Sequence, residues 1–236
     1  MKTWPGILDR VAFPTQLTAQ VVTPTADPRI HGYAVQADLG RHADFLDVAW
    51  LAFTGEVPSA GERAALSLAL IWLAPVAINE SPTHAAVLAK VAGAPEEVVP
   101  AIAAVAVGQQ TAAECAALAP LFAWLDAGVG LPPAAWLEPE PTAGQAEAWS
   151  ALATQSAHWF GAERALPAAP VLRRVAGAYA LLHRLGVRDL PRLHALSLWA
   201  RLPTILAEAA CAASGAVMTY PAHLPAYQYV EDEVGA

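Results

Sequence analysis

The sequence predicts an all-α fold, and two observations carry that prediction. From Asp44 onward, apolar residues recur at the three- and four-residue spacing that places them on one face of a helix. Helix-start and helix-stop signals divide these segments: Ser59 and Glu62 have the spacing of a capping box, and Gly55 suits a left-handed C-terminal cap. The chain shows no internal repeat and no sustained heptad, so neither a solenoid nor a coiled coil is expected.

Residues 1–42 are expected to form an irregular N-terminal arm. This stretch contains Pro5, Pro14, Pro24 and Pro28 and has few helix-forming residues. A β-leaning stretch at 17–23 leaves a short hairpin open as an alternative.

Residues 43–127 form the first helical part of the chain. Glycines mark the expected helix ends, and Gly108 is expected to break one helix. Thr111 and Glu114 have the spacing of a second capping box, which predicts a new helix start at that point. The expected helices cover residues 44–54, 59–72, 83–92, 96–107 and 111–126.

Residues 128–142 are the clearest linker in the chain because six of them are glycine or proline. The regions on its C-terminal side are a helical part at 143–190 and a C-terminal helix with a tail at 191–236. Pro203 is expected to kink or split the last helix. Helices are expected over residues 143–160, 170–185 and 191–213.

The composition favours a protein partner over a nucleic acid or a membrane. Hydrophobic residues make up 56% of the chain and charged residues only 14%, so few charges are available to cover the surface of a monomer. An apolar face is therefore expected to contact another chain. The net charge of −8 and the absence of a basic run exclude the concentrated positive surface that nucleic acids and anionic membranes require.

The N-terminus lacks the apolar core of a signal peptide, and the longest uncharged apolar windows, 64–79 and 98–113, are shorter than the roughly 20 residues of a membrane span. A cytoplasmic protein is expected. Cys115 and Cys211 lie in alanine-rich surroundings and are expected to be reduced.

Short motifs identify no chemistry. The chain has no glycine-rich phosphate loop after a strand, no G-x-S-x-G and no CxxC pair. None of the seven histidines pairs with another at the i, i+4 spacing of a helical zinc site, so no metal site is expected.

One pattern is more specific. Arg29-Ile30-His31-Gly32-Tyr33, followed by residues 45–59 (FLDVAWLAFTGEVPS), resembles the N-terminal signature of citrate synthases and citryl-CoA lyases. Weaker resemblances follow at 81–83, at 101–108 and at 199–203 with Glu208, so that the similarity extends over 29–213. The short chain is closer to a compact citryl-CoA lyase than to a full citrate synthase.

This resemblance implies a helical dimer in which a large domain and a small domain close over a CoA thioester and a 2-oxo acid. The large domain would include 43–127 and the C-terminal helix, and 143–190 would be a reduced small domain. The CoA thioester would be a ligand, and no resident cofactor is implied.

In the family, two histidines donate hydrogen bonds to the reacting oxygens and an aspartate removes the α-proton. The matching positions in this chain are Thr111, Ala162 and Ala176, and none of these residues can replace the family's group. Arg201 is retained and could bind a substrate carboxylate. The arginine that the family lends to the neighbouring site is missing from 218–229.

Three hypotheses follow. The leading one is a non-catalytic subunit or regulatory partner, in a homodimer or in a heterodimer with an active family member, with Thr111 serving as a helix cap. The second is an active acyl-CoA condensing or cleaving enzyme with relocated groups, for which His84, His158, Glu114 and Arg201 are the candidates. The third is a sensor that binds CoA, citrate or a similar metabolite without reacting.

Overall fold

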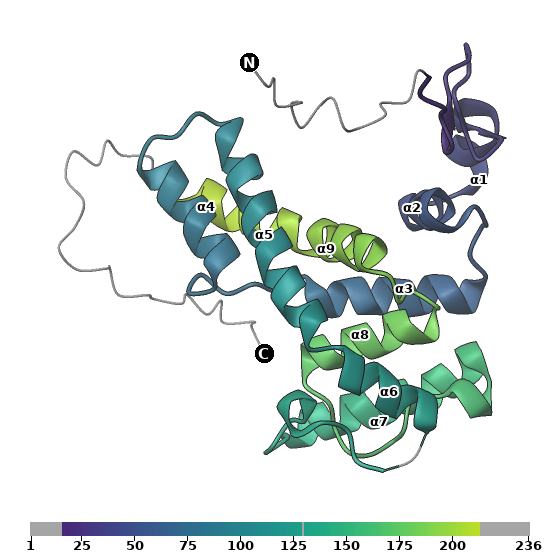
Figure 1. The fold of residues 1–236 in the computed structure, drawn as a ribbon, viewed down its shortest axis with the longest axis vertical. Helices are drawn as coiled ribbons and strands as arrows, with labels where there is room; N and C mark the ends of the chain where they lie inside the picture. Colours follow the sequence, from purple (N-terminus) through teal and green to yellow (C-terminus); the bar gives the residue numbers. More distant parts are fainter. Residues whose placement is uncertain (1–15, 129, 213–236) are drawn as a thin grey trace, which may run out of the picture. The chain divides into compact units, whose positions relative to one another are not determined.

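The computed structural model describes residues 16–128 and 130–212, which divide into two compact units at Pro58 and Ser59 (Figure 1). Most described residues are helical, which confirms the predicted all-α fold class.

The described part of the first unit contains a small antiparallel sheet in the order β1-β2-β3. Its strands are Val22–Thr23, Arg29–Ile30 and Tyr33–Ala34. A tight turn joins the last two strands, with positive φ angles of 46° at His31 and 90° at Gly32. The hairpin left open by the sequence is therefore present, within a region that was expected to be irregular. A π-helical turn, Val35–Leu39, and the short helix α1, Gly40–His42, follow the sheet.

Helix α2, Phe45–Thr54, completes the first unit with the predicted C-terminal cap. Gly55 is left-handed, with φ 80°, and its N–H donates to the Leu51 carbonyl. At the other end, the Asp44 side chain accepts from the Asp47 N–H, and the Asp47 side chain accepts from the Asp44 N–H. This reciprocal capping box was not singled out in the sequence.

The second unit is built from longer helices, several with the predicted starts. Ser59 and Glu62 form the expected capping box at the start of α3, and Thr142 and Gln145 form another at the start of α7. Gly128 ends α6 in a left-handed conformation. The helices are α3 Ala60–Leu73, α4 Ser81–Val91, α5 Val98–Ala116, α6 Ala119–Ala127, α7 Ala143–Phe160, α8 Arg174–Arg184 and α9 Leu190–Cys211.

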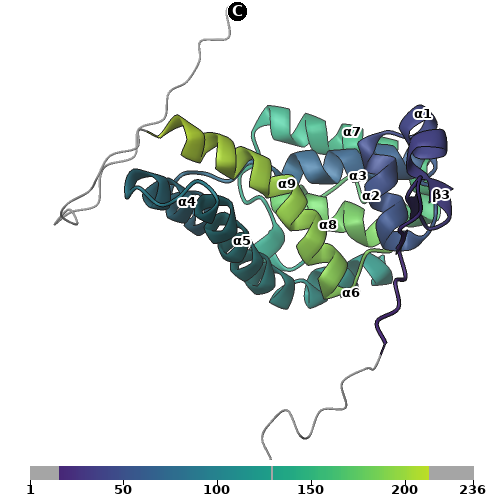
Figure 2. The same cartoon turned by 90° about the horizontal axis from the view of Figure 1, so that it is seen from above.

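Helices α4, α5 and α9 pack against one another, and α8 packs along α3 (Figure 1; Figure 2). The contact among α4, α5 and α9 is made largely by small side chains, which allow close approach of the helix backbones. Its buried core consists of Ala86, Val99, Ala103, Val107, Ile205 and Ala209.

Two breaks that the sequence suggested, one at Gly108 and one at Pro203, are absent from the structure. Helix α5 runs unbroken through Gly108 to Ala116, so Thr111 is an interior, buried residue and not a helix cap. Burial of one α5 face against α4 and α9 outweighs the penalty of roughly 1 kcal/mol for an interior glycine. Helix α9 likewise continues through Pro203, which lies exposed, so the predicted split does not occur.

Residues 130–142 of the predicted linker contain a short 3-10 turn, Ala134–Trp136, and Leu137 forms an isolated bridge with Leu172. The division into a large and a small domain remains a prediction. Among the described residues, none of the individual helices is long and apolar enough to cross a bilayer; α5 and α6 reach that length and apolarity only as a pair bent by 49°.

Candidate functional site

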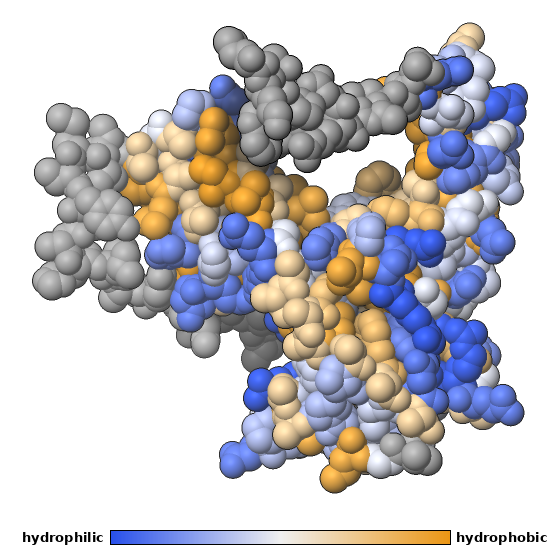
Figure 3. Space-filling model, in the orientation of Figure 1, coloured by the Kyte–Doolittle hydropathy of each residue, from blue (hydrophilic) through white to orange (hydrophobic). Residues whose placement is uncertain are grey.

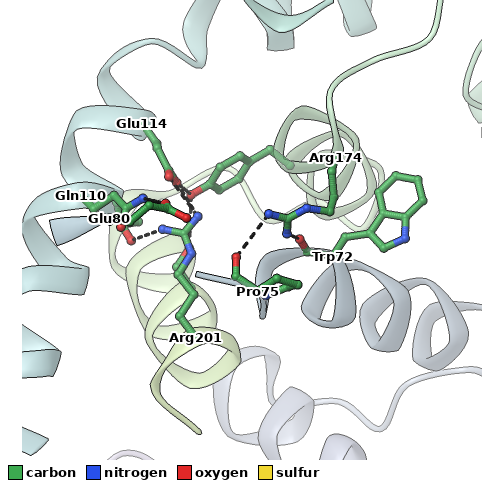
Figure 4. Close-up of polar contacts among 10 residues, drawn as sticks. Trp72, Pro75, Glu80, Gln110, Glu114, Arg174 and Arg201 are labelled. Carbon is green, nitrogen blue, oxygen red and sulfur yellow. Dashed lines mark hydrogen bonds and ion pairs between the residues drawn. The ribbon is translucent and has the colours of Figure 1, made fainter. Parts of the chain in front are cut away.

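A buried ion pair joins α5 and α9 in the interior of the second unit (Figure 4). The Nη2 atom of Arg201, on α9, donates to both carboxylate oxygens of Glu114, on α5, at 3.0 and 2.8 Å. The Arg201 side chain is 2% exposed and that of Glu114 is 18% exposed. Water therefore has little access to the guanidinium, and Glu114 supplies its counter-charge.

Helix α8 adds a third group to this pair. The hydroxyl of Tyr179 donates to the Glu114 Oε2 at 2.6 Å and lies 3.3 Å from the Ser197 hydroxyl. Burial raises the pKa of Tyr179 well above its usual range, and the Glu114 charge raises it further. Tyr179 therefore remains a neutral phenol that donates its proton to the carboxylate.

Thr111 lies one helical turn before Glu114 on α5 and faces the same guanidinium. Its hydroxyl is 3.5 Å from the Nη1 atom of Arg201, at the outer limit of a hydrogen bond, and the residue is fully buried. The structure thus brings two of the sequence-predicted positions, Thr111 and Arg201, into contact.

A second polar group lies beside the first (Figure 4). Gln110, on α5, donates to Glu80 at 2.9 Å, and Glu80 also accepts from the Ala77 N–H at 2.7 Å. Arg174, at the start of α8, donates to the carbonyls of Trp72 and Pro75 at the end of α3. Burial lowers the pKa of Arg174, while the charges of Glu80 and Glu114 raise it. Arg174, Arg201, Glu80 and Glu114 together carry no net charge.

The chemistry available to these groups is limited because each is occupied by another part of the chain. Arg201 is paired with Glu114, and Tyr179 stays protonated. Arg174 donates to backbone carbonyls at and just beyond the end of α3. The neighbouring thiol of Cys115 is buried, and burial raises its pKa to about 11, with the Glu114 charge acting in the same direction. A thiol with that pKa is mostly un-ionised at neutral pH and is a poor nucleophile.

Comparison with solved structures shows a likeness in fold. The chain matches the structure of citryl-CoA lyase from Hydrogenobacter thermophilus with a TM-score of 0.59 over 93% of this chain and 97% of that one, at 12% sequence identity. The chain has a citryl-CoA-lyase-like fold. Neither the scan against protein-family models nor the search of curated proteins gives a match.

Within this citryl-CoA-lyase-like fold, Ala176 and Ala162, the other two positions singled out from the sequence, have different surroundings. Ala176 is fully buried on α8, one turn before Tyr179. Ala162 is exposed in the short turn after α7 and lines a hollow that Thr111, Ala176 and Arg201 do not line. The hollow beside Ala162 therefore includes neither Thr111 nor Ala176.

The relocated-enzyme hypothesis named four residues, and the structure joins two of them, Glu114 and Arg201. His84 lies half-buried on α4, and His158 lies exposed near the end of α7. No group of three or more His, Cys, Asp or Glu in the described ranges is arranged to hold a metal ion.

Sequence analysis missed the pairing of Glu114 with Arg201 and the contribution of Tyr179. One signal was present: Gln110, Thr111 and Glu114 fall within one turn of a segment that is otherwise mostly alanine and valine. Polar residues at i, i+1 and i+4 share one face of a helix, so this stripe indicates a polar contact with a neighbouring helix.

Proposed function

We propose that this chain is a non-catalytic protein with a citryl-CoA-lyase-like fold, which acts as a subunit or regulatory partner of an active protein of that fold. The observation that carries the proposal is the Glu114–Arg201 pair. A guanidinium that binds a substrate carboxylate needs free donors facing the site. In this chain, Glu114 takes both hydrogen bonds from Nη2 of Arg201 and supplies the counter-charge of this buried guanidinium, which leaves Nη1 and Nε as its other donors.

The aligned positions add support from chemistry. Thr111 is buried with its hydroxyl toward Arg201, and the methyl groups of Ala162 and Ala176 cannot donate or accept a proton. Loss of a single member of a catalytic unit lowers the rate by several powers of ten, and loss of all members leaves little beyond binding. Turnover by this chain alone is therefore not expected.

An interface role is supported by the outer face of α5. This face carries no charged residue over 98–116, because Glu114 points inward. Val105 is 64% exposed at its centre, and Figure 3 shows apolar colouring over much of the helix. A long uncharged helix face is typical of a surface that another chain covers, in a homodimer or a heterodimer. The uncharged face consists of Ala101, Val105, Gln109, Ala112 and Ala116.

Native mass spectrometry tests the interface. The wild-type chain is expected to form a dimer alone, or with an active subunit when the two are co-expressed, and Val105→Glu should abolish that dimer by burying a charge in the contact. Ala148→Glu on α7 introduces the same charge change on another helix and should leave assembly intact. A wild-type chain that stays monomeric in every combination would contradict the proposal.

The remaining hypotheses make different predictions in an activity assay. CoA release from acetyl-CoA with oxaloacetate, and oxaloacetate formation from citryl-CoA, should be absent for the chain alone and altered only when the active partner is present. A relocated enzyme would give at least one of these products without a partner. A sensor would show no turnover but would gain thermal stability with CoA or citrate, because ligands that bind only the native state raise its melting point.

A further inference from the structure

A hollow of about 750 Å³ lies at the ends of α6 and α8, where the segment after α7 passes over them. It is separate from the Glu114–Arg201 site, whose residues do not line it. Charged side chains from three parts of the second unit form its wall. They are Asp126 at the end of α6, Glu163 and Arg164 in the turn after α7, and Arg184 and Arg188 at and beyond the end of α8.

All three arginines make contacts within the chain. Arg184 donates from Nη2 to the carbonyls of Leu125, at 3.1 Å, and Ala165, at 3.4 Å. Arg188 forms a two-bond pair with the Asp126 carboxylate at 2.9 and 3.1 Å. Arg164 donates to the Arg184 carbonyl and leans over the Phe160 ring, with its guanidinium carbon 5.9 Å from the ring centroid.

These contacts leave cationic donor capacity unused. Each guanidinium carries five N–H groups. The hydrogen bonds described above use only Nη2 of Arg164 and of Arg184, so they do not take up the other N–H groups of these two side chains.

The charges of the wall also do not balance. Three guanidinium groups face two carboxylates, so the hollow carries a net positive charge in a chain whose overall net charge is −8. Burial lowers the pKa of Arg184, and the charges of Arg164 and Arg188 lower it further against the opposing effect of Asp126. The three cations therefore repel one another, and an anion placed among them would relieve that repulsion.

We propose that this hollow binds a compact polyanion through Arg164, Arg184 and Arg188, with the charge carried on carboxylate or phosphate oxygens. Planar guanidinium groups match both kinds of oxyanion through paired N–H donors. The volume accommodates a small metabolite and not a polymer. This site is independent of the function proposed above.

Isothermal titration of the full chain tests the proposal with two probes, pyrophosphate for phosphate oxygens and tricarballylate for carboxylate oxygens, at constant ionic strength. One-to-one binding of at least one probe is expected, and the stronger probe identifies the oxyanion. Heat that does not saturate for either probe at about 10 mM would overturn the proposal, because ionic contacts of this kind yield at least millimolar affinity.

Matched variants show whether bound probe occupies the hollow. Arg164→Gln removes an exposed arginine of the wall and should weaken binding about tenfold or more. Arg173→Gln makes the same charge change at the opposite end of α8, roughly 16 Å away by helix length, and should change affinity less than twofold. Equal losses in the two variants, or no loss in Arg164→Gln, would show that the probe binds elsewhere.

Discussion

Replacing Glu114 by alanine is expected to lower the free energy of unfolding by about 3–5 kcal/mol, which is the range for breaking a buried ion pair on one side. The substitution strips the buried Arg201 guanidinium of its carboxylate and removes the acceptor for the Tyr179 hydroxyl. Arg201 is 2% exposed, so water cannot replace the lost partner without local opening. Thr111, at 3.5 Å, is too distant to compensate.

The size of the effect should depend on which partner is removed. Glu114→Gln keeps one oxygen within reach of Arg201 and should cost about 2–3 kcal/mol. Arg201→Met leaves a carboxylate that is 18% exposed and still bonded to Tyr179, so it should cost less than Glu114→Ala. Combining Glu114→Gln with Arg201→Met should be less destabilising than the sum of the single changes by about 1.5 kcal/mol or more, because the two side chains act as one unit.

Urea unfolding at pH 7, followed by far-ultraviolet circular dichroism, measures these differences provided that the slope with urea stays constant. Glu147→Gln, an exposed carboxylate on α7, is the matched control and should stay within about 0.5 kcal/mol of wild type. A cost below about 1 kcal/mol for Glu114→Ala, or strict additivity in the double variant, would refute the description of a desolvated, coupled pair.

Three further predictions concern packing, thiol reactivity and pH. Gly177→Ala should destabilise the protein by about 1–3 kcal/mol, because a methyl group there would lie 2.4 Å from a ring carbon of Trp72; urea unfolding measures it. In the native protein Cys115, buried and with a pKa raised to about 11, should react far more slowly with iodoacetamide at pH 8 than the exposed Cys211, as peptide mass spectrometry would show. Burial lowers the pKa of His183, so the unfolded state takes up a proton first and stability should fall as the pH drops from about 6.5 towards 5. His183→Gln should reduce that slope, by at most about 1.4 kcal/mol per pH unit.

The packing and pH predictions each have a matched control. Gly144→Ala places its methyl group in open space at the start of α7 and should be neutral or stabilising by up to about 1 kcal/mol. His158→Gln changes an exposed histidine and should leave the pH slope unaltered. Equal costs at Gly177 and Gly144, or an unchanged slope in His183→Gln, would contradict the packing and the burial described for these positions.

The helices around residues 44–73 could be predicted because their boundaries depend on nearby residues. The capping box of Ser59 with Glu62 and the left-handed Gly55 satisfy backbone groups within one turn, so the pattern determines the structure. The same logic failed at Thr111 and Glu114, which have capping-box spacing but lie inside a helix. Their partner is Arg201, 87 residues beyond Glu114. Packing among three helices therefore outweighed the local capping pattern, and α5 continues through Thr111.

In the candidate site too, some residues could be predicted from the sequence and others could not. Arg201 and Thr111 could be chosen from the family resemblance, because both belong to short ordered motifs. The role of Glu114 could not, since a carboxylate that pairs with a distant arginine has no signature of its own in one sequence. Ala162 could be named but not placed, because the structure puts it on a different hollow from Arg201.

The measurement that tests the central claim most directly is turnover by the purified chain, run alone and then with an active partner subunit: CoA release from acetyl-CoA with oxaloacetate, and oxaloacetate formation from citryl-CoA. We predict no product above the protein-free rate for the chain alone, and an altered rate only in the presence of the partner. Product formation by the chain alone that persists through repurification and is lost in Glu114→Gln would contradict the account, because it would make the occupied Arg201 site an active one.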